Sequence, residues 1–173
     1  MNEQRVPQLD AFNGDSQIAR RHLIHCCGSA RWVEAMIAQR PFGSSKHLYD
    51  CASDCWRTLR RDDWLEAFSR HPRIGEAPEK RALDAAERGW AEKEQSGAAA
   101  AGSPVRADLA EGNGQYEARF GYVFIVCATG KSGEEMLGLL RMRLKNEPEV
   151  ELAIAAAEQE KITRIRLERL LFP

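Results

Sequence analysis

A histidine followed by a proline ends a predicted helix, in the sequence His71-Pro72-Arg73-Ile74-Gly75-Glu76. Pro72 fixes its own φ angle and keeps His71 out of the helical conformation, so the backbone that carries the imidazole is held rigidly. Histidine titrates nearest to neutrality, which suits it to general acid or base catalysis. The alternative is a ring that only caps the helix or packs against it.

Three further polar residues could complete a site. Glu94 and Gln95 fall on a predicted helix, where the alternative is a solvated charged face. Arg166 falls on the apolar stripe of the last predicted helix, and a buried arginine needs a carboxylate or an anionic ligand beside it. An internal carboxylate would satisfy it equally well. Together with His71, these residues suit a small, polar, anionic substrate.

Other kinds of catalytic site have less support. Neither a Gly-x-Ser-x-Gly nucleophile elbow nor a glycine-rich phosphate loop is present. Cys51 and Cys55 lie one helical turn apart near several histidines, but the Cys-x-x-Cys spacing of structural zinc is absent, so we expect no metal. Cysteine is often simply buried, and an odd total of 5 favours reduced thiols.

The composition is nearly neutral. The 173 residues carry 25 basic and 26 acidic side chains, for a formal net charge of -1. This balance gives no general attraction to nucleic acid or to an anionic membrane. No apolar run approaches the ~20 residues of a membrane span, and the N-terminus lacks the apolar core of a secretory signal. We therefore expect one cytoplasmic domain over residues 1–173, without nucleic-acid or membrane partners.

The apolar residues recur at helical spacing along most of the chain. Periodicity, caps and turn residues predict an all-α fold, a compact bundle of roughly eight helices. The predicted helices cover approximately residues 16–27, 30–39, 45–59, 62–70, 79–97, 105–119, 132–144 and 147–170. The alanine-rich stretch 96–103 is compatible with a mobile loop or with a helix.

One segment departs from this pattern. Residues 120–128 are aromatic and β-branched, and the turn sequence Thr129-Gly130-Lys131 follows them. They predict a short, buried, extended segment near residues 121–128. Because no second strand is evident, its backbone N–H and C=O groups need other partners, of which a bound ligand is one.

The order of these motifs resembles a known enzyme family. The residues that carry the resemblance are His71-Pro72-Arg73-Ile74-Gly75, Glu94-Gln95, Tyr116-x-x-Arg119, the segment 120–128, Lys161-Ile162-x-x-x-Arg166-Leu167 and also Arg40-Pro41-Phe42. Over about residues 12–170 the chain is similar to the 2-oxo-4-hydroxy-4-carboxy-5-ureidoimidazoline (OHCU) decarboxylases. These enzymes act third in the route from urate to (S)-allantoin, after hydroxyisourate hydrolysis.

The resemblance implies an all-α carboxy-lyase without a cofactor, usually a homodimer, that acts on a small ureidoimidazoline. It implies functional coupling to hydroxyisourate hydrolase. It implies His71 and Glu94 as catalytic residues, with His71 as the acid/base. The implied substrate-binding set is Pro72, Ala91, Gln95, Phe124, Ile125, Val126, Cys127, Ala128 and Arg166.

Ala91 is a departure from the family pattern. Many members have a serine three residues before the glutamate, where this chain has Ala91. The loss of a hydroxyl bears on substrate affinity more than on reaction class. It supports a second interpretation, a helical module that binds ureides without turnover. A third, a hydrolase of a related ureide, would need an activated water.

Overall fold

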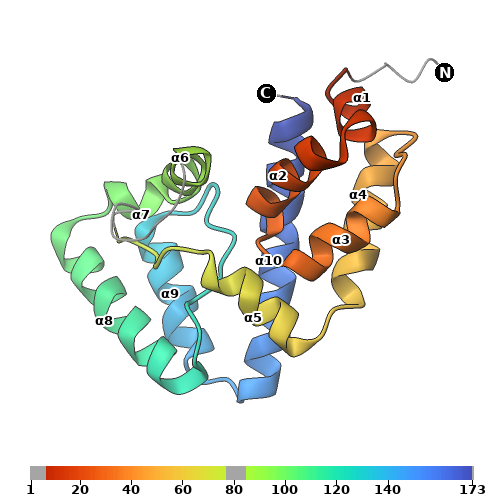
Figure 1. Cartoon of the computed structure of the whole chain (residues 1–173). Helices are drawn as coiled ribbons and strands as arrows, with labels where there is room; N and C mark the ends of the chain where they lie inside the picture. Colours follow the sequence, from red (N-terminus) through yellow and green to blue (C-terminus); the bar gives the residue numbers. More distant parts are fainter. Residues whose placement is uncertain (1–6, 77–84, 173) are drawn as a thin grey trace. The chain divides into compact units, whose positions relative to one another are not determined.

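The structure, a computed structural model, describes residues 7–76 and 85–172. The described residues form ten α-helices and no strand, so the predicted all-α fold is confirmed (Figure 1). None of the helices in these two ranges is long and apolar enough to cross a membrane.

The chain divides into two compact units. The terminal unit comprises Met1–Ala67 and Glu160–Pro173, and the central unit comprises Phe68–Gln159. Two helices contribute to both units: α5 (Arg61–Ser69) and α10 (Pro148–Leu171). The expectation of one domain over residues 1–173 stays a prediction.

Side-chain caps start three helices of the terminal unit. They are α2 (Ser16–Cys27), α3 (Ala30–Ala38) and α4 (Ser45–Arg57), capped by Asp15, Ser29 and Ser44 respectively. Each cap accepts a hydrogen bond from a backbone N–H of the first turn, which has no partner within the helix. The unit's core contains Leu23, Trp32, Met36 and Leu48, all fully buried.

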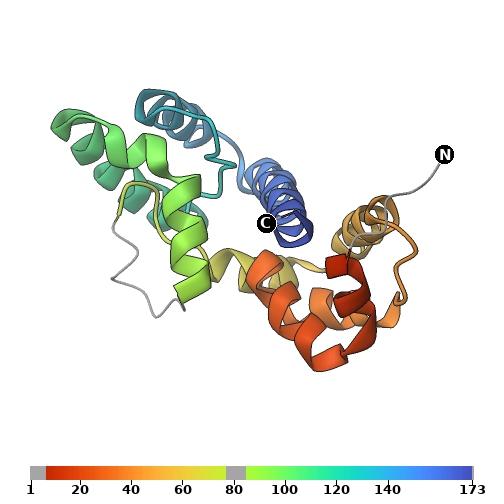
Figure 2. The same cartoon turned by 90° about the horizontal axis from the view of Figure 1, so that it is seen from above.

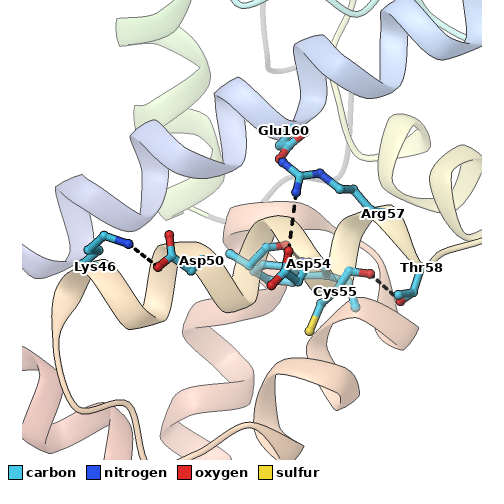
Figure 3. A network of polar contacts seen from close by, with 9 residues as sticks. Lys46, Asp50, Asp54, Cys55, Arg57, Thr58 and Glu160 are labelled. Atoms are coloured by element: carbon cyan, nitrogen blue, oxygen red, sulfur yellow. Dashed lines mark hydrogen bonds and ion pairs between the residues drawn. The ribbon is translucent and has the colours of Figure 1, made fainter.

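Ion pairs cover the exposed face of α4 (Figure 3). Lys46 Nζ lies 2.6 Å from the Asp50 carboxylate, and Arg57 lies 3.4 Å from Asp54 and 3.5 Å from Glu160 of α10. Exposed pairs of this kind contribute at most about 1 kcal/mol each. The terminal unit therefore depends mainly on its apolar core.

The central unit contains α6 (Ala85–Glu94), α7 (Ser96–Ala100), α8 (Ser103–Phe120), α9 (Gly133–Arg143) and the first half of α10. Ser132 caps α9 in a capping box with Glu135. Helices α8 and α9 lie side by side (Figure 2). A Cβ at Gly112 of α8 would lie 2.6 Å from Cδ2 of the fully buried Leu140 of α9, so glycine permits this close approach.

Two short helices lie outside the set of predicted helices. One is α1 (Pro7–Gly14), and the other is α7, which takes the helical alternative that was left open for the alanine-rich stretch 96–103. Both are too short to display a helical period, and tertiary packing decides α7. Ala98 is fully buried, and a Cβ at Gly97 would collide with the Lys131 backbone. Helix α6 ends at Glu94 rather than 97, and residues 79–84 lie outside the described residues.

The extended segment is confirmed as a buried stretch without regular structure at residues 122–128. The carbonyl of Ile125 accepts a hydrogen bond from Arg143 Nη1 at 2.7 Å. The Arg143 guanidinium carbon also lies 4.7 Å from the ring centroid of Phe124. Arg143, at the end of α9, thus provides one of the partners that the segment needs.

Arg143 is itself neutralised inside the core. Its Nη2 lies 2.5 Å from Glu151 Oε1, and the two side chains are 3% and 0% exposed. The Tyr116 hydroxyl donates to Glu151, and Asn146 Nδ2 donates to the other carboxylate oxygen at 2.8 Å. Burial and the bond to Glu151 raise the pKa of the Tyr116 hydroxyl, so it remains a donor at neutral pH.

We expect Arg143→Met to lower the free energy of unfolding by about 3–5 kcal/mol, because it leaves the Glu151 carboxylate buried without its cation. The matched control is Arg141→Met on the same helix. Arg141 forms an exposed pair with Asp108 at 2.7 Å, so its loss should change stability by less than about 1 kcal/mol. Urea denaturation followed by circular dichroism measures both variants. Equal stability of the two would contradict the account of the buried pair.

The two glycines of α8 should respond oppositely to alanine. At Gly114 nothing lies within 4 Å of an added methyl group, so Gly114→Ala should stabilise the protein by about 0.5–1 kcal/mol through helix propensity. Gly112→Ala should destabilise it by about 1–3 kcal/mol, because the new methyl group displaces Leu140. Thermal unfolding of both variants tests the difference in sign.

Candidate active site

His71 lies where α5 gives way to an irregular loop. Its backbone N–H donates to the Phe68 carbonyl at 3.0 Å, and the loop continues to Glu76. His71 is 8% exposed, and Pro72 is buried beside it. The predicted acid/base is thus a largely buried imidazole on a proline-restrained backbone.

Side chains from α8 anchor the loop that carries His71 through an ion pair and a hydrogen bond. Arg73 forms a two-pronged ion pair with Glu117, with Nε–Oε1 at 2.6 Å and Nη2–Oε2 at 2.8 Å. Fully buried Asn113 donates from Nδ2 to the Ile74 carbonyl at 2.8 Å. The hydrogen bonds to Glu117 and Glu76 raise the pKa of Arg73 above its usual value, so this anchor remains charged. Such a fork restricts orientation as well as distance.

Gln95 binds the same loop from its other side. The N–H of Gly75 donates to Gln95 Oε1 at 3.1 Å, and Gly75 has a φ of +81°, a conformation that favours glycine. Because the backbone group is a donor, the amide must turn its oxygen toward it. The Nε2 group of Gln95 is therefore directed away from Gly75, as a donor for another partner.

The end of α6 brings Ala91 and Glu94 to one buried face. They are three residues apart on the helix and 3% and 8% exposed. Burial raises the pKa of the Cys127 thiol, Lys131 opposes this, and the negative charges of Glu158 and Glu94 reinforce it. Glu94 therefore lies close enough to the segment 122–128 to act on it electrostatically. The alternative interpretation of Glu94, a solvated charged face, does not describe this buried side of α6.

Side chains also bind the backbone of Cys127. Its N–H donates to Glu158 Oε2 at 2.7 Å, and its carbonyl accepts from Lys131 Nζ at 2.7 Å. With the Ile125 carbonyl bound by Arg143 and the Ala128 carbonyl bound by the Lys131 N–H, four backbone groups of the predicted substrate-binding segment are already engaged within the protein. Substrate contacts by residues 124–128 stay a prediction, which we now direct to the remaining backbone groups, mainly both groups of Val126 and the N–H of Ala128.

The structure thus gathers most of the predicted site in the central unit. Gln95, which lies between α6 and α7, binds the His71 loop. The ring centroids of Phe68 and Tyr122 lie 5.3 Å apart, which places the end of α5 against the start of the segment. The predicted residues in this unit are His71, Pro72, Ala91, Glu94, Gln95, Phe124, Ile125, Val126, Cys127 and Ala128.

Arg166 belongs to the terminal unit. It is 7% exposed on α10, as its position on the apolar stripe predicted, and its Nη1 donates to the His25 carbonyl at 3.1 Å. Burial raises the pKa of the neighbouring Cys27 thiol to about 12, and the charge of Arg166 acts in the opposite direction. Cys27 is therefore a protonated, unreactive thiol at neutral pH.

Sequence reasoning missed the residues that hold the loop and the segment. Asn113 shares the buried face of α8 with Leu109 and Tyr116, and Glu151 shares that of α10 with Ala155. The rule that selected Arg166, a polar residue on an apolar stripe, could have selected them. The missed anchors are Asn113, Glu117, Lys131, Arg143, Glu151 and Glu158. Across the described residues, no three His, Cys, Asp or Glu side chains gather as a metal site requires.

Comparison with known proteins agrees with this arrangement. Residues 14–168 match the family model described as OHCU decarboxylase. A uric acid degradation bifunctional protein of Arabidopsis thaliana is 42% identical over 147 residues, which are 84% of this chain but only 45% of that protein. The chain thus spans under half the length of this relative.

Single-function relatives match over most of their length. A 2-oxo-4-hydroxy-4-carboxy-5-ureidoimidazoline decarboxylase of Amia calva is 37% identical, covering 79% of this chain and 78% of that protein. A crystal structure of OHCU decarboxylase in the presence of (S)-allantoin has a TM-score of 0.77 and 35% identity, covering 92% of this chain and 100% of the other. By its sequence, its helical fold and the motifs gathered around His71, this chain belongs to the OHCU decarboxylase family.

Proposed function

We propose that this protein decarboxylates 2-oxo-4-hydroxy-4-carboxy-5-ureidoimidazoline to (S)-allantoin and CO2, as a carboxy-lyase of urate degradation. The observation that carries the proposal is the loop of His71, which Gln95, Asn113 and Glu117 hold rigidly. A similar fold has been crystallised as an OHCU decarboxylase in the presence of (S)-allantoin, which supports the choice of substrate.

The proposed reaction needs little from the protein besides proton transfer and oriented dipoles. The substrate carries a carboxylate and a hydroxyl on one ring carbon, beside a C=N bond. When the C–CO2 bond breaks, its electron pair moves toward that C=N bond, so the substrate is its own electron sink and a cofactor is not required. A proton must then be delivered to one face of the ring to give a single allantoin enantiomer.

We assign the roles from the geometry of the central unit. His71 transfers the proton, because histidine is the residue type on the rigid loop whose usual pKa lies nearest to neutrality. Glu94 accepts a hydrogen bond from the substrate's hydroxyl or ring N–H. Gln95 donates from Nε2 toward charge that develops on the ring, since its Oε1 is held by Gly75. The role of Arg166, which belongs to the terminal unit, is assigned from the family resemblance alone. Its guanidinium would bind an oxygen-rich edge of the substrate.

Replacing His71 should strongly lower the rate of turnover and spare the fold. For His71→Asn we expect kcat to fall by about 10²–10⁴-fold, the usual contribution of a positioned acid or base. Urate oxidase and hydroxyisourate hydrolase generate the substrate, and circular dichroism follows the appearance of optically active allantoin. His47→Asn is the control, because His47 is exposed on α4. Near-normal turnover of His71→Asn would refute its catalytic role.

Turnover by the wild-type protein and by an Ala91 variant distinguishes a decarboxylase from a module that binds ureides without turnover. We expect wild-type protein to form (S)-allantoin well above the slow racemic background, and Ala91→Ser to lower KM with little change in kcat. The reason is that a hydroxyl at this buried position adds one substrate contact on the face of Glu94. Allantoin binding without any acceleration by the wild-type protein would favour the binding module instead.

We further propose that the protein acts as a cytoplasmic homodimer, in sequence with hydroxyisourate hydrolase. The family resemblance supports the dimer. Bifunctional uric acid degradation relatives in Arabidopsis thaliana and Bacillus subtilis support a link between consecutive steps. Light scattering on the purified protein, alone and mixed with the hydrolase, measures both associations. A monomeric protein that does not associate with the hydrolase would refute both proposals.

A further inference from the structure

Cys127 has both of its backbone groups bound by charged side chains. Glu158 accepts its N–H and Lys131 donates to its carbonyl, each at 2.7 Å. Hydrogen bonds with one ionised partner are roughly twice as strong as neutral ones. Both bonds lie within the central unit, where Glu158 comes from α10 and Lys131 from the turn before α9.

The turn after the segment returns Lys131 to Cys127. The Lys131 N–H donates to the Ala128 carbonyl at 3.0 Å, and Gly130, the third residue of this turn, has a φ of +80°. Since Thr129 does not have a positive φ, these features define a type II turn. The turn places the Lys131 side chain four residues after the carbonyl that it binds, so the contact is built into the local fold.

These two bonds determine where the neighbouring peptide groups point. A trans peptide is planar, so its N–H and C=O point in opposite directions. Because Glu158 holds the N–H of Cys127, the Val126 carbonyl of the same peptide must point away from Glu158. Because Lys131 holds the carbonyl of Cys127, the N–H of Ala128 must point away from Lys131. One acceptor is thereby directed away from Glu158, and one donor is directed away from Lys131.

Val126 has backbone groups that remain available. Val126 is 4% exposed, and neither its N–H nor its carbonyl has a hydrogen-bond partner within residues 7–76 and 85–172. A buried backbone group without a partner is uncommon and costly. The Val126 carbonyl therefore lies ready for a donor from a bound molecule, with the Ala128 N–H as the adjacent donor. A ureido or cyclic amide group offers both complementary atoms.

We propose that Glu158 and Lys131 are positioning residues of the decarboxylase, which act through Cys127 to aim the Val126 carbonyl and the Ala128 N–H at the substrate. The inference rests on the proposed function, because it concerns the same site. Neither side chain takes part in proton transfer. Their role is to hold two backbone groups in place before the substrate arrives, which avoids reorganisation in the reaction.

The test compares Glu158→Leu with Glu158→Gln. The leucine variant leaves the Cys127 N–H without an acceptor, and we expect kcat/KM to fall by about tenfold to a hundredfold, mainly through KM. Glutamine keeps an acceptor oxygen and removes the charge, so it should retain kcat/KM within about threefold. Calorimetric titration with (S)-allantoin should show the same order of affinities. Glu160→Leu is the matched control, because Glu160 lies on the same helix and forms its ion pair with the exposed side chain of Arg57.

Each outcome decides the inference. A folded Glu158→Leu variant with wild-type KM would overturn it, and so would equal losses in Glu158→Gln and Glu158→Leu, because the charge itself would then act in the reaction. Should the leucine variant fail to fold, Lys131→Met tests the second bond, and an unchanged KM there overturns the inference. Absence of allantoin formation by the wild-type protein would instead refute the proposed function, independently of these variants.

Discussion

The central unit is organised by one constraint: an extended segment is buried among helices, with no strand beside it in the described part of the chain. Helices satisfy their own backbone groups, but an isolated extended segment does not. Polar side chains must therefore reach its N–H and C=O groups. Arg143 reaches the Ile125 carbonyl, and Glu158 and Lys131 reach Cys127.

This constraint explains why charged residues lie inside an otherwise apolar core. Once Arg143 is buried, its charge requires a carboxylate, and the Glu151 carboxylate in turn requires donors beyond that one arginine. Tyr116 and Asn146 supply these donors from α8 and from the connection before α10. The aromatic rings of Tyr116 and Phe124, 5.2 Å apart, close the same cluster. One segment without a partner strand thus accounts for buried polar side chains on three helices, α8, α9 and α10.

Sequence periodicity predicts which residues are buried but not which backbone atom a buried polar residue binds. It correctly predicted the all-α fold, the buried segment without helical structure near residues 121–128 and the burial of Arg166. The anchors could not be assigned in the same way, because they join elements that are distant in sequence. Arg73 and Glu117 are 44 residues apart, and Cys127 and Glu158 are 31 apart. Their pairing depends on how helices pack, and local propensity carries no information about it.

Both irregular parts of the candidate site follow the same physical rule. The His71 loop and the segment 122–128 lack the hydrogen-bond ladder of a helix or sheet, and each is held by side chains from neighbouring helices. Helix α8 serves both, since Asn113 and Glu117 hold the loop while Tyr116 belongs to the Arg143 cluster. Backbone groups of irregular segments carry no sequence signature, so the side chains that hold them are identified only in the folded structure. A site of this kind is described completely only when its anchors are counted with the groups that face the substrate.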